Sequence, residues 1–257
     1  MGRPAGEGQK IDAAKPAVLM LHGAGLDHSV WTLPARYLAH HDRSVIAPDL
    51  PGHGCSAGAP LTSISALADW AWQLLDTLGI AKAVLVGHSM GALTALHMAA
   101  RRPDRSRHLF LIGAAAEMPV QADLLQAAHD DQHLADALIA MWGFGPAGRI
   151  GGNVMPGVQM RLAGQALLDR AKRGVLAADL TACAAYRDGI ADAGQVRCTT
   201  TLLLGAADRM TPAGKGQQLA DLMTQVPGGV RLNILAGCGH MIMAERPNET
   251  IDLLRAV

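Results

Sequence analysis

The stretch Gly87-His88-Ser89-Met90-Gly91 joins a short apolar run, Ala83–Val86, to an amphipathic pattern, Met90–Arg101. The apolar run predicts a buried strand, and the amphipathic pattern predicts a helix. A serine in a G-x-S-x-G sequence at such a turn is held in a strained conformation that presents Oγ above the sheet. The glycines are required because side chains at those positions would collide with the adjoining strand and helix. The stretch therefore predicts that Ser89 is a nucleophile; a Gly-rich turn with a capping serine is the alternative.

Short apolar runs alternate with helical patterns on both sides of this turn. Such alternation, with continuously apolar strands, is typical of a mostly parallel α/β sheet that is covered by helices on both faces. The expected strands are Ala17–Leu21, Ser44–Ala47, Ala83–Val86, His108–Ile112, Thr200–Leu204 and Val230–Leu235. The expected helices between them are Val30–Ala39, Ser63–Leu78, Met90–Arg101, Ala213–Thr224 and Glu245–Ala256.

One long segment, from Ala114 to Val196, contains no convincing strand. Its patterns predict helices near Gln121–Trp142, Val158–Lys172 and Val175–Arg187. We therefore expect a core made of residues 1–113 and 197–257, with residues 114–196 inserted as a helical cap, or lid. The loop at 143–148 matches GxGxxG, but it follows a helix and contains a proline, so we expect a cap loop rather than a dinucleotide site.

Composition excludes several classes of protein. The 22 Lys and Arg balance the 22 Asp and Glu, and only 3% of residues are aromatic, which argues against nucleic-acid binding. No apolar stretch reaches the roughly 20 residues of a membrane-spanning helix. The N-terminal residues lack the apolar core of a secretory signal. The four cysteines are scattered without metal-ligand spacing, so we expect free thiols in a cytoplasmic protein. We also expect neither a metal nor a cofactor. A small-molecule substrate is the expected partner, and monomer and homodimer both stay open.

A serine nucleophile needs a base, and His240 is the strongest of the eleven histidines. It follows the last expected strand and precedes the final helix, where the carboxyl ends of parallel strands meet. His88 adjoins Ser89, but its side chain should point away from Oγ. His97 lies inside a helix and should be packed there. The other histidines are expected on solvated helices or on loops near the site.

Asp208 is the expected acid, because it ends the strand before the one that leads to His240. Thr211 and Pro212 then form an expected N-cap and first helical position. The alternative for such an aspartate is a surface turn, which Asp49 exemplifies better. The order Ser89, Asp208, His240 matches the chain order typical of α/β hydrolases.

Taken together, these residues make the chain similar to the α/β-hydrolase fold superfamily, of the capped serine-esterase type. The resemblance extends from Ala17 to the C-terminus and rests on the motifs His22-Gly23-Ala24-Gly25, Asp49–Ser56, Gly87–Gly91, Gly205–Pro212 and Gly237–His240, together with Trp31. It implies that Ala24, with Gly25 as the less favoured alternative, supplies one oxyanion N–H, and the turn itself predicts a second from Met90. Two departures stand out: little chain precedes Ala17 for the family's first strand pair, and Ala24 replaces a bulky aromatic residue.

The implied reaction is acyl transfer through an acyl-enzyme. His240 takes the Ser89 proton, and Asp208 holds the imidazole in the right tautomer. Methionines and other side chains beside the triad and in the cap are expected to line an adaptable apolar pocket, although each cap residue is equally well explained as core. The expected pocket residues are Gly25, His88, Met118, Met141, Trp142, Met210 and Met241, and further cap candidates are Phe144 and Met155.

The sequence thus predicts a serine hydrolase for a small or medium, largely apolar carboxylic ester or lactone. Alternatives stay open: the same triad on a C–C bond, a thioester or an N-terminal prolyl peptide, or a ligand receptor with negligible turnover. A peptidase would need an acid in the cap, for which Glu117, Asp123 and Asp130 are candidates. Arg209 would pair a substrate carboxylate or, as we expect, form a surface salt bridge.

Overall fold

The sheet is all-parallel in the part of the chain described by this computed structural model, which comprises residues 11–12, 15–130, 132–149, 152, 157 and 159–256. Its order is β2-β1-β3-β4-β5-β6. The strands are β1 (Ala17–Leu21), β2 (Ser44–Ile46), β3 (Ala83–His88), β4 (Ser106–Ile112), β5 (Thr199–Gly205) and β6 (Val230–Leu235). All six predicted strands are confirmed; the question of a strand pair before Ala17 falls mainly on residues outside the described ranges.

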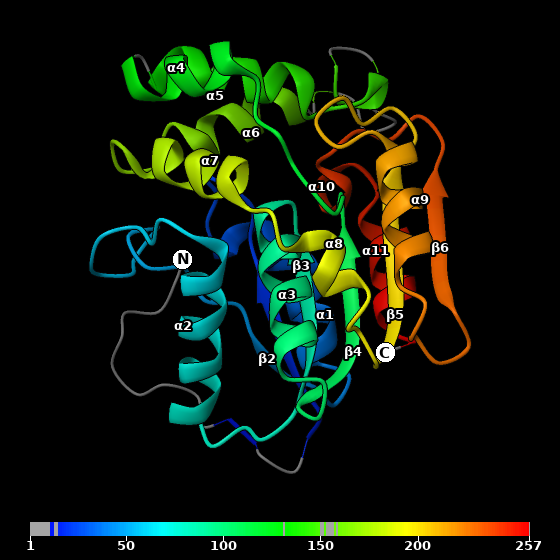
Figure 1. Cartoon of the computed structure of the whole chain (residues 1–257). Helices are drawn as coiled ribbons and strands as arrows, with labels where there is room; N and C mark the ends of the chain where they lie inside the picture. Colours follow the sequence, from blue (N-terminus) through cyan, green and yellow to red (C-terminus); the bar gives the residue numbers. More distant parts are fainter. Residues whose placement is uncertain are drawn as a thin grey trace.

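Helices cover both faces of the sheet (Figure 1). Those that lie where the sequence predicts helices in the core are η1 (His28–Trp31), α1 (Thr32–Ala39), α2 (Ile64–Thr77), α3 (Met90–Arg101), α9 (Ala213–Leu222) and α11 (Pro247–Leu254). The short helix α10 (Ile242–Glu245) ends where the last predicted helix begins and was not predicted. Side chains alternate between the faces of a strand, so Leu19 and Leu85 pack with α2 and α3, while Val18 and Val86 pack on the side of α1 and α11.

The chain between β4 and β5 forms further helices, of which those within residues 122–185 lie at the top in Figure 1, beyond the carboxyl ends of the strands, while the last lies lower, beside α3. They are α4 (Ala122–Asp130), α5 (Gln132–Trp142), η2 (Pro146–Gly148), α6 (Met160–Leu168), α7 (Val175–Ala185) and α8 (Gly189–Ala193). The last of these, α8, was not predicted, because five residues are too few to show a helical period. It packs against α3 and α9 rather than with α4–α7.

The start of α9 corrects one prediction. This helix begins at Ala213 with Pro212 as its N-cap, so Thr211 does not cap it. The Thr211 hydroxyl bonds elsewhere, as described below.

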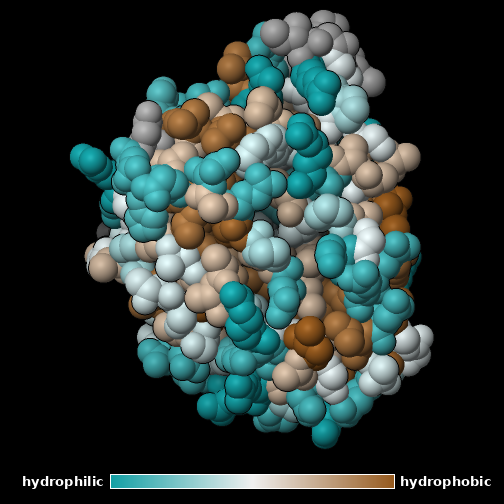
Figure 2. Space-filling view, turned by 45° about the horizontal axis from the view of Figure 1, so that its top comes forward, coloured by the Kyte–Doolittle hydropathy of each residue, from teal (hydrophilic) through white to brown (hydrophobic). Residues whose placement is uncertain are grey.

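Apolar side chains form separate patches among polar ones on the face shown in Figure 2. No helix in the described part of the chain is both long and apolar enough to cross a membrane.

Candidate active site

Ser89 lies at the turn between β3 and α3 in a conformation that non-glycine residues rarely adopt. Its φ is 53° and its ψ is −118°. A Cβ on Gly91 would lie 2.2 Å from the Leu21 carbonyl oxygen, and one on Gly87 would lie 2.1 Å from that of Gly91. Neither position admits a side chain, as the sequence predicts. The close approach of β1, β3 and α3 therefore keeps Ser89 in its strained turn.

Asp208 and His240 follow adjacent strands and are brought into contact. The His240 Nδ1 lies 2.7 Å from the Asp208 Oδ2, and both residues are buried. The Asp208 Oδ1 accepts hydrogen bonds from the backbone N–H of Met210 and of Thr211, at 2.8 and 2.9 Å. Burial by itself would raise the pKa of Asp208, but the charge and hydrogen bond of His240 and the bonds from Thr211 outweigh it and lower this pKa. Asp208 is thus held as a carboxylate beside His240.

Thr211 is a member of this cluster that the sequence did not single out. Its hydroxyl donates to the Asp208 Oδ2 at 2.7 Å or to the Gly113 carbonyl at 3.0 Å, and lies 3.0 Å from the His240 Nδ1. The only sequence signal was its place three residues after Asp208, which we interpreted as a cap. The side chain instead joins Asp208 and His240 to the end of β4.

The other ring nitrogen of His240 is Nε2, and both His240 and Ser89 line one cavity. This Nε2 is buried and has no hydrogen-bond partner among the described residues. The backbone N–H groups of His240 and Met241 both donate to the Gly143 carbonyl at 2.9 Å. A residue that follows α5 thus fixes the loop that carries His240.

His88 is placed so that it does not compete as a base. Its Nε2 donates to the His240 carbonyl at 3.0 Å, so the proton resides on Nε2 and Nδ1 is bare. Complete burial is the main cause that lowers the pKa of His88 to about 3, and the electrostatic effect of the nearby His240 is the second. His88 is therefore a neutral spacer beside the Ser89 turn, although it does line the cavity.

The loop after β1 approaches Ser89 directly. A Cβ on Gly23 would lie 3.2 Å from the Ser89 Cβ. The His22 Nε2 accepts the Leu50 N–H at 3.1 Å, which leaves the proton on Nδ1 for the Gly23 carbonyl at 2.9 Å. His22 is thus a hydrogen-bonded structural residue. Ala24, predicted as an oxyanion donor, lines the cavity together with Ser89.

This cavity has a volume of about 130 Å³ and a mostly apolar wall that combines strand-end loops with α4–α7. Five of the predicted pocket residues line it: His88, Met118, Trp142, Met210 and Met241. Phe144 lines it as well. Two predictions were wrong, because neither Met141 nor Gly25 lines the cavity. The Met141 side chain is 44% exposed, and the Gly25 N–H donates to Asp179. Met155 lies outside the described residues.

Comparisons with known proteins agree with this arrangement. A family model described as alpha/beta hydrolase fold matches residues 16–247. The chain belongs to the α/β hydrolase fold family.

Two curated relatives of this α/β hydrolase carry the name pimeloyl-[acyl-carrier protein] methyl ester esterase. The protein of Aromatoleum aromaticum is 31% identical over 261 aligned residues, which cover 95% of this chain and 98% of that protein. The protein of Chromobacterium violaceum is 32% identical over 221 residues, covering 80% and 81%. The enol-lactonase of Burkholderia xenovorans LB400 superposes with a TM-score of 0.83 over 99% of this chain and 93% of its own. At 22% identity that likeness shows the fold alone.

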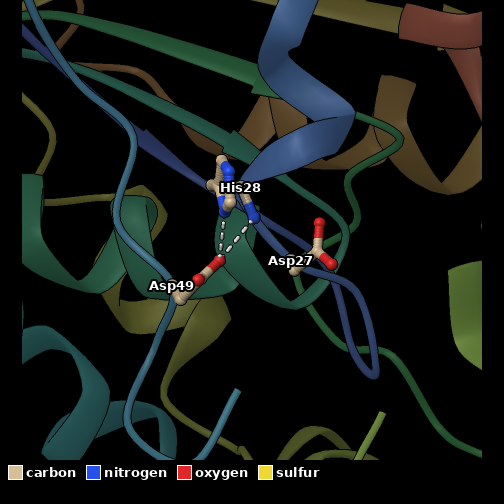
Figure 3. Close-up of side chains that lie close together, drawn as sticks. All are labelled: Asp27, His28 and Asp49. Atoms are coloured by element: carbon tan, nitrogen blue, oxygen red, sulfur yellow. Dashed lines mark hydrogen bonds and ion pairs between the residues drawn. The ribbon is translucent and has the colours of Figure 1, made fainter. Parts of the chain in front are cut away.

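Three side chains of this α/β hydrolase lie close enough together to hold a metal ion, but their bonds within the protein explain why they cluster. Asp27, His28 and Asp49 offer ligand atoms within 4.8 Å of one another. Figure 3 shows that the Asp49 carboxylate accepts bonds from the backbone and the ring of His28, at 2.8 and 2.7 Å. It also accepts the Cys55 N–H, while Asp27 caps η1 and pairs with Arg170. Asp49 is thus a buried loop anchor and not the surface turn residue we expected.

The charged residues considered for substrate binding differ in whether they line the cavity. Glu117, Asp123 and Asp130 are exposed and lie outside the cavity lining, which argues against an amine subsite. Arg209 lines the cavity and forms no ion pair with any residue that the structure describes, contrary to the expected surface salt bridge.

Proposed function

We propose that this α/β hydrolase is a serine hydrolase that cleaves small or medium, largely apolar carboxylic esters or lactones. One observation carries the proposal: Ser89, in its strained turn, lines the same apolar cavity as His240, whose Nδ1 is bonded to Asp208 and whose Nε2 has no partner among the described residues. The names of the two curated relatives, both methyl ester esterases, support the same bond class.

In the proposed mechanism, the His240 Nε2 accepts the Ser89 proton as Oγ attacks the acyl carbon. The Asp208 carboxylate holds the Nδ1 proton and stabilises the imidazolium that forms. The backbone N–H groups of Ala24 and Met90 donate to the oxyanion. His240 then protonates the leaving alcohol, and water releases the acid from the acyl-enzyme by the same route in reverse.

Residues 114–196 are proposed to act as the cap. The cavity wall formed by α4–α7 supports this role, because those helices separate the strand ends from solvent. The packing of α8 against α3 and α9 suggests that the moving part of the cap would end before α8. A cytoplasmic location also stays a proposal, in keeping with four cysteines that all carry free thiols.

The test is multiple turnover on a panel of nitrophenyl esters with varied acyl chains, lactones, and methyl esters of mono- and dicarboxylic acids. Wild-type protein should turn over several of these esters, and Ser89→Ala should lower kcat by about 10⁴-fold or more. Ser65→Ala, at an exposed position on α2, is the control and should match wild type. Absence of turnover on every ester and lactone would refute the proposal, and turnover confined to thioesters would redirect it to that bond.

A further inference from the structure

A buried aspartate of the helical segment contacts the loop that approaches Ser89. Asp179 lies on α7 and is fully buried. Its Oδ2 accepts the backbone N–H of Gly25 at 2.8 Å and lies 2.7 Å from the Nε2 of His53. Gly25 and His53 are 154 and 126 residues away in the sequence. These bonds therefore join three separate parts of the chain.

The bonds of His53 indicate that it is charged. Its Nδ1 lies 3.1 Å from the Pro51 carbonyl, which only accepts, and its Nε2 faces the Asp179 carboxylate. Both ring nitrogens thus donate, as in an imidazolium. Burial disfavours this charge, but the hydrogen bond and the charge of Asp179 outweigh it and raise the pKa of His53. Asp179 is consequently a carboxylate within a buried ion pair, a strong acceptor for the Gly25 N–H.

The loop from Gly23 to Leu26 is held by two further bonds. The Gly23 carbonyl accepts the His22 Nδ1–H at 2.9 Å and the Leu26 N–H at 3.2 Å. In a trans peptide the N–H points opposite to the carbonyl, so these bonds turn the Ala24 N–H away from His22. The next peptide, with the Gly25 N–H, is fixed from the other side by Asp179. The orientation of the Ala24 N–H therefore depends on both anchors.

We propose that Asp179, charged and oriented by His53, is a positioning residue that sets the oxyanion-binding loop from the cap. This rests on the proposed function, in which Ala24 is an oxyanion donor. A displacement of α7 would break the Gly25 bond and misalign the donor. The hydrolase would thus assemble its oxyanion site only when the cap helix is seated.

The test compares Asp179→Ala with Asp192→Ala. Asp192 forms another buried aspartate–histidine contact, 2.6 Å from the His97 Nδ1, but it lies on α8 and does not line the cavity. Asp179→Ala should lower kcat by about 10- to 100-fold with KM within about 3-fold, because the lost alignment acts on the transition state. Asp192→Ala should lower thermal stability and leave kcat unchanged. Asp179→Asn, whose amide oxygen still accepts the Gly25 N–H, should recover most of the loss.

Equal kcat for folded Asp179→Ala and wild type would overturn the proposal, as would an equal fall in both alanine variants. If Asp179→Ala does not fold, His53→Gln carries the test: a several-fold fall in kcat at constant KM supports the proposal, and no change overturns it.

Hydrogen exchange of the Gly25 amide separates this inference from the proposed function. Protection in wild type that is lost in a folded Asp179 or His53 variant establishes the anchor even if no ester is turned over. An unprotected Gly25 amide in the wild-type protein would refute the anchor even if ester turnover is fast.

Discussion

Ser89 adopts a backbone conformation that costs a non-glycine residue about 1–3 kcal/mol. The cost is tolerated because strands and a helix close on the turn from both sides, leaving room only for glycine at positions 87 and 91. Ser89 thereby lines the same cavity as His240, whose Nε2 has no hydrogen-bond partner among the described residues. The strain is thus a property of one residue that the packing of its neighbours maintains.

Replacing Asp208 with asparagine should lower kcat by about 10³- to 10⁴-fold. The amide is neutral, so it no longer stabilises a His240 imidazolium, and its N–H groups conflict with the donors of Thr211. Steady-state kinetics on a nitrophenyl ester measure the effect, with circular dichroism to confirm folding. The control is Asp221→Asn, at an exposed position on α9. A kcat within 10-fold of wild type would rule out the proposed role of Asp208.

Acidification should destabilise the protein through His22 and His88. Burial is the main cause that lowers their pKa values, from 6.5 to about 4 and about 3. A lowered folded pKa means that the stabilisation is present above pH 6.5 and is lost as the pH falls toward the folded value. Each residue should therefore remove about 2 kcal/mol from the free energy of unfolding between pH 7 and pH 5.

Urea unfolding at pH 7 and pH 5 checks this expectation, with His88→Gln beside wild type. The variant should lose about 2 kcal/mol less than wild type over that interval. His53, whose pKa is raised, acts in the opposite direction in both proteins and cancels from the comparison. Equal losses in the two proteins would show that His88 is not held neutral.

At the scale of elements, the unit that positions the proposed nucleophile is β3, the Ser89 turn and α3, packed against β1. The central place of β3, between β1 and β4, buries it on both faces. Met90 is the first residue of α3, so its N–H belongs to the helix N-terminus that directly follows Ser89. This geometry requires α3 to approach the Leu21 carbonyl more closely than any side chain permits.

Gly91→Ala should therefore lower the free energy of unfolding by about 3 kcal/mol, because α3 must move away from β1 to admit the methyl group. The same displacement should impair ester turnover. Gly214→Ala is the matched control, since it lies on α9 with open space around the new Cβ, and helix propensity should make it neutral or stabilising by up to about 1 kcal/mol. Thermal and urea unfolding measure both variants. Equal stability of the two would contradict the close approach.

At the scale of the whole molecule, the cavity exists because segments far apart in sequence meet beyond the strand ends. The Gly143 carbonyl holds the His240 loop, and the two carboxylate oxygens of Glu245 accept the N–H groups of Gly145 and Gly239, each at 2.9 Å. The loop after α5 is thereby bound to the loop that carries the proposed base. The residue that follows α5 therefore helps to define both the wall and the chemistry of the cavity.

Trp142→Ala should widen this cavity and shift acyl-chain preference toward longer esters. Removing the indole from the lining makes room for extra methylene groups, so kcat/KM for an octanoyl ester relative to a butyryl ester should rise about 10-fold. Met141→Ala is the matched control, because the adjacent side chain is exposed and outside the lining. A panel of nitrophenyl esters gives the ratio. An equal shift in both variants would mean that Trp142 does not limit the chain length.

Periodicity predicted much of this molecule. The strands are continuously apolar because both faces of a parallel sheet are buried, and this leaves a strong local signal. The turn around Ser89 and the residues after β5 and β6 were recognisable because a G-x-S-x-G turn, an aspartate and a histidine follow three strands in the chain order typical of α/β hydrolases. The roles of Thr211 and Asp179 were not predicted, since a threonine after an aspartate resembles a cap and an aspartate within a helix resembles a solvated face.

The amino-acid sequence by itself determined the order of strands and helices and the three strand ends that carry Ser89, Asp208 and His240, because local pattern and turn chemistry act between near neighbours. Only the tertiary structure decided which of the neighbours Met141 and Trp142 faces the cavity, and that Asp179 reaches Gly25 across 154 residues. Contacts of this kind depend on how whole elements pack, and packing energies between distant segments leave no periodic trace in the chain.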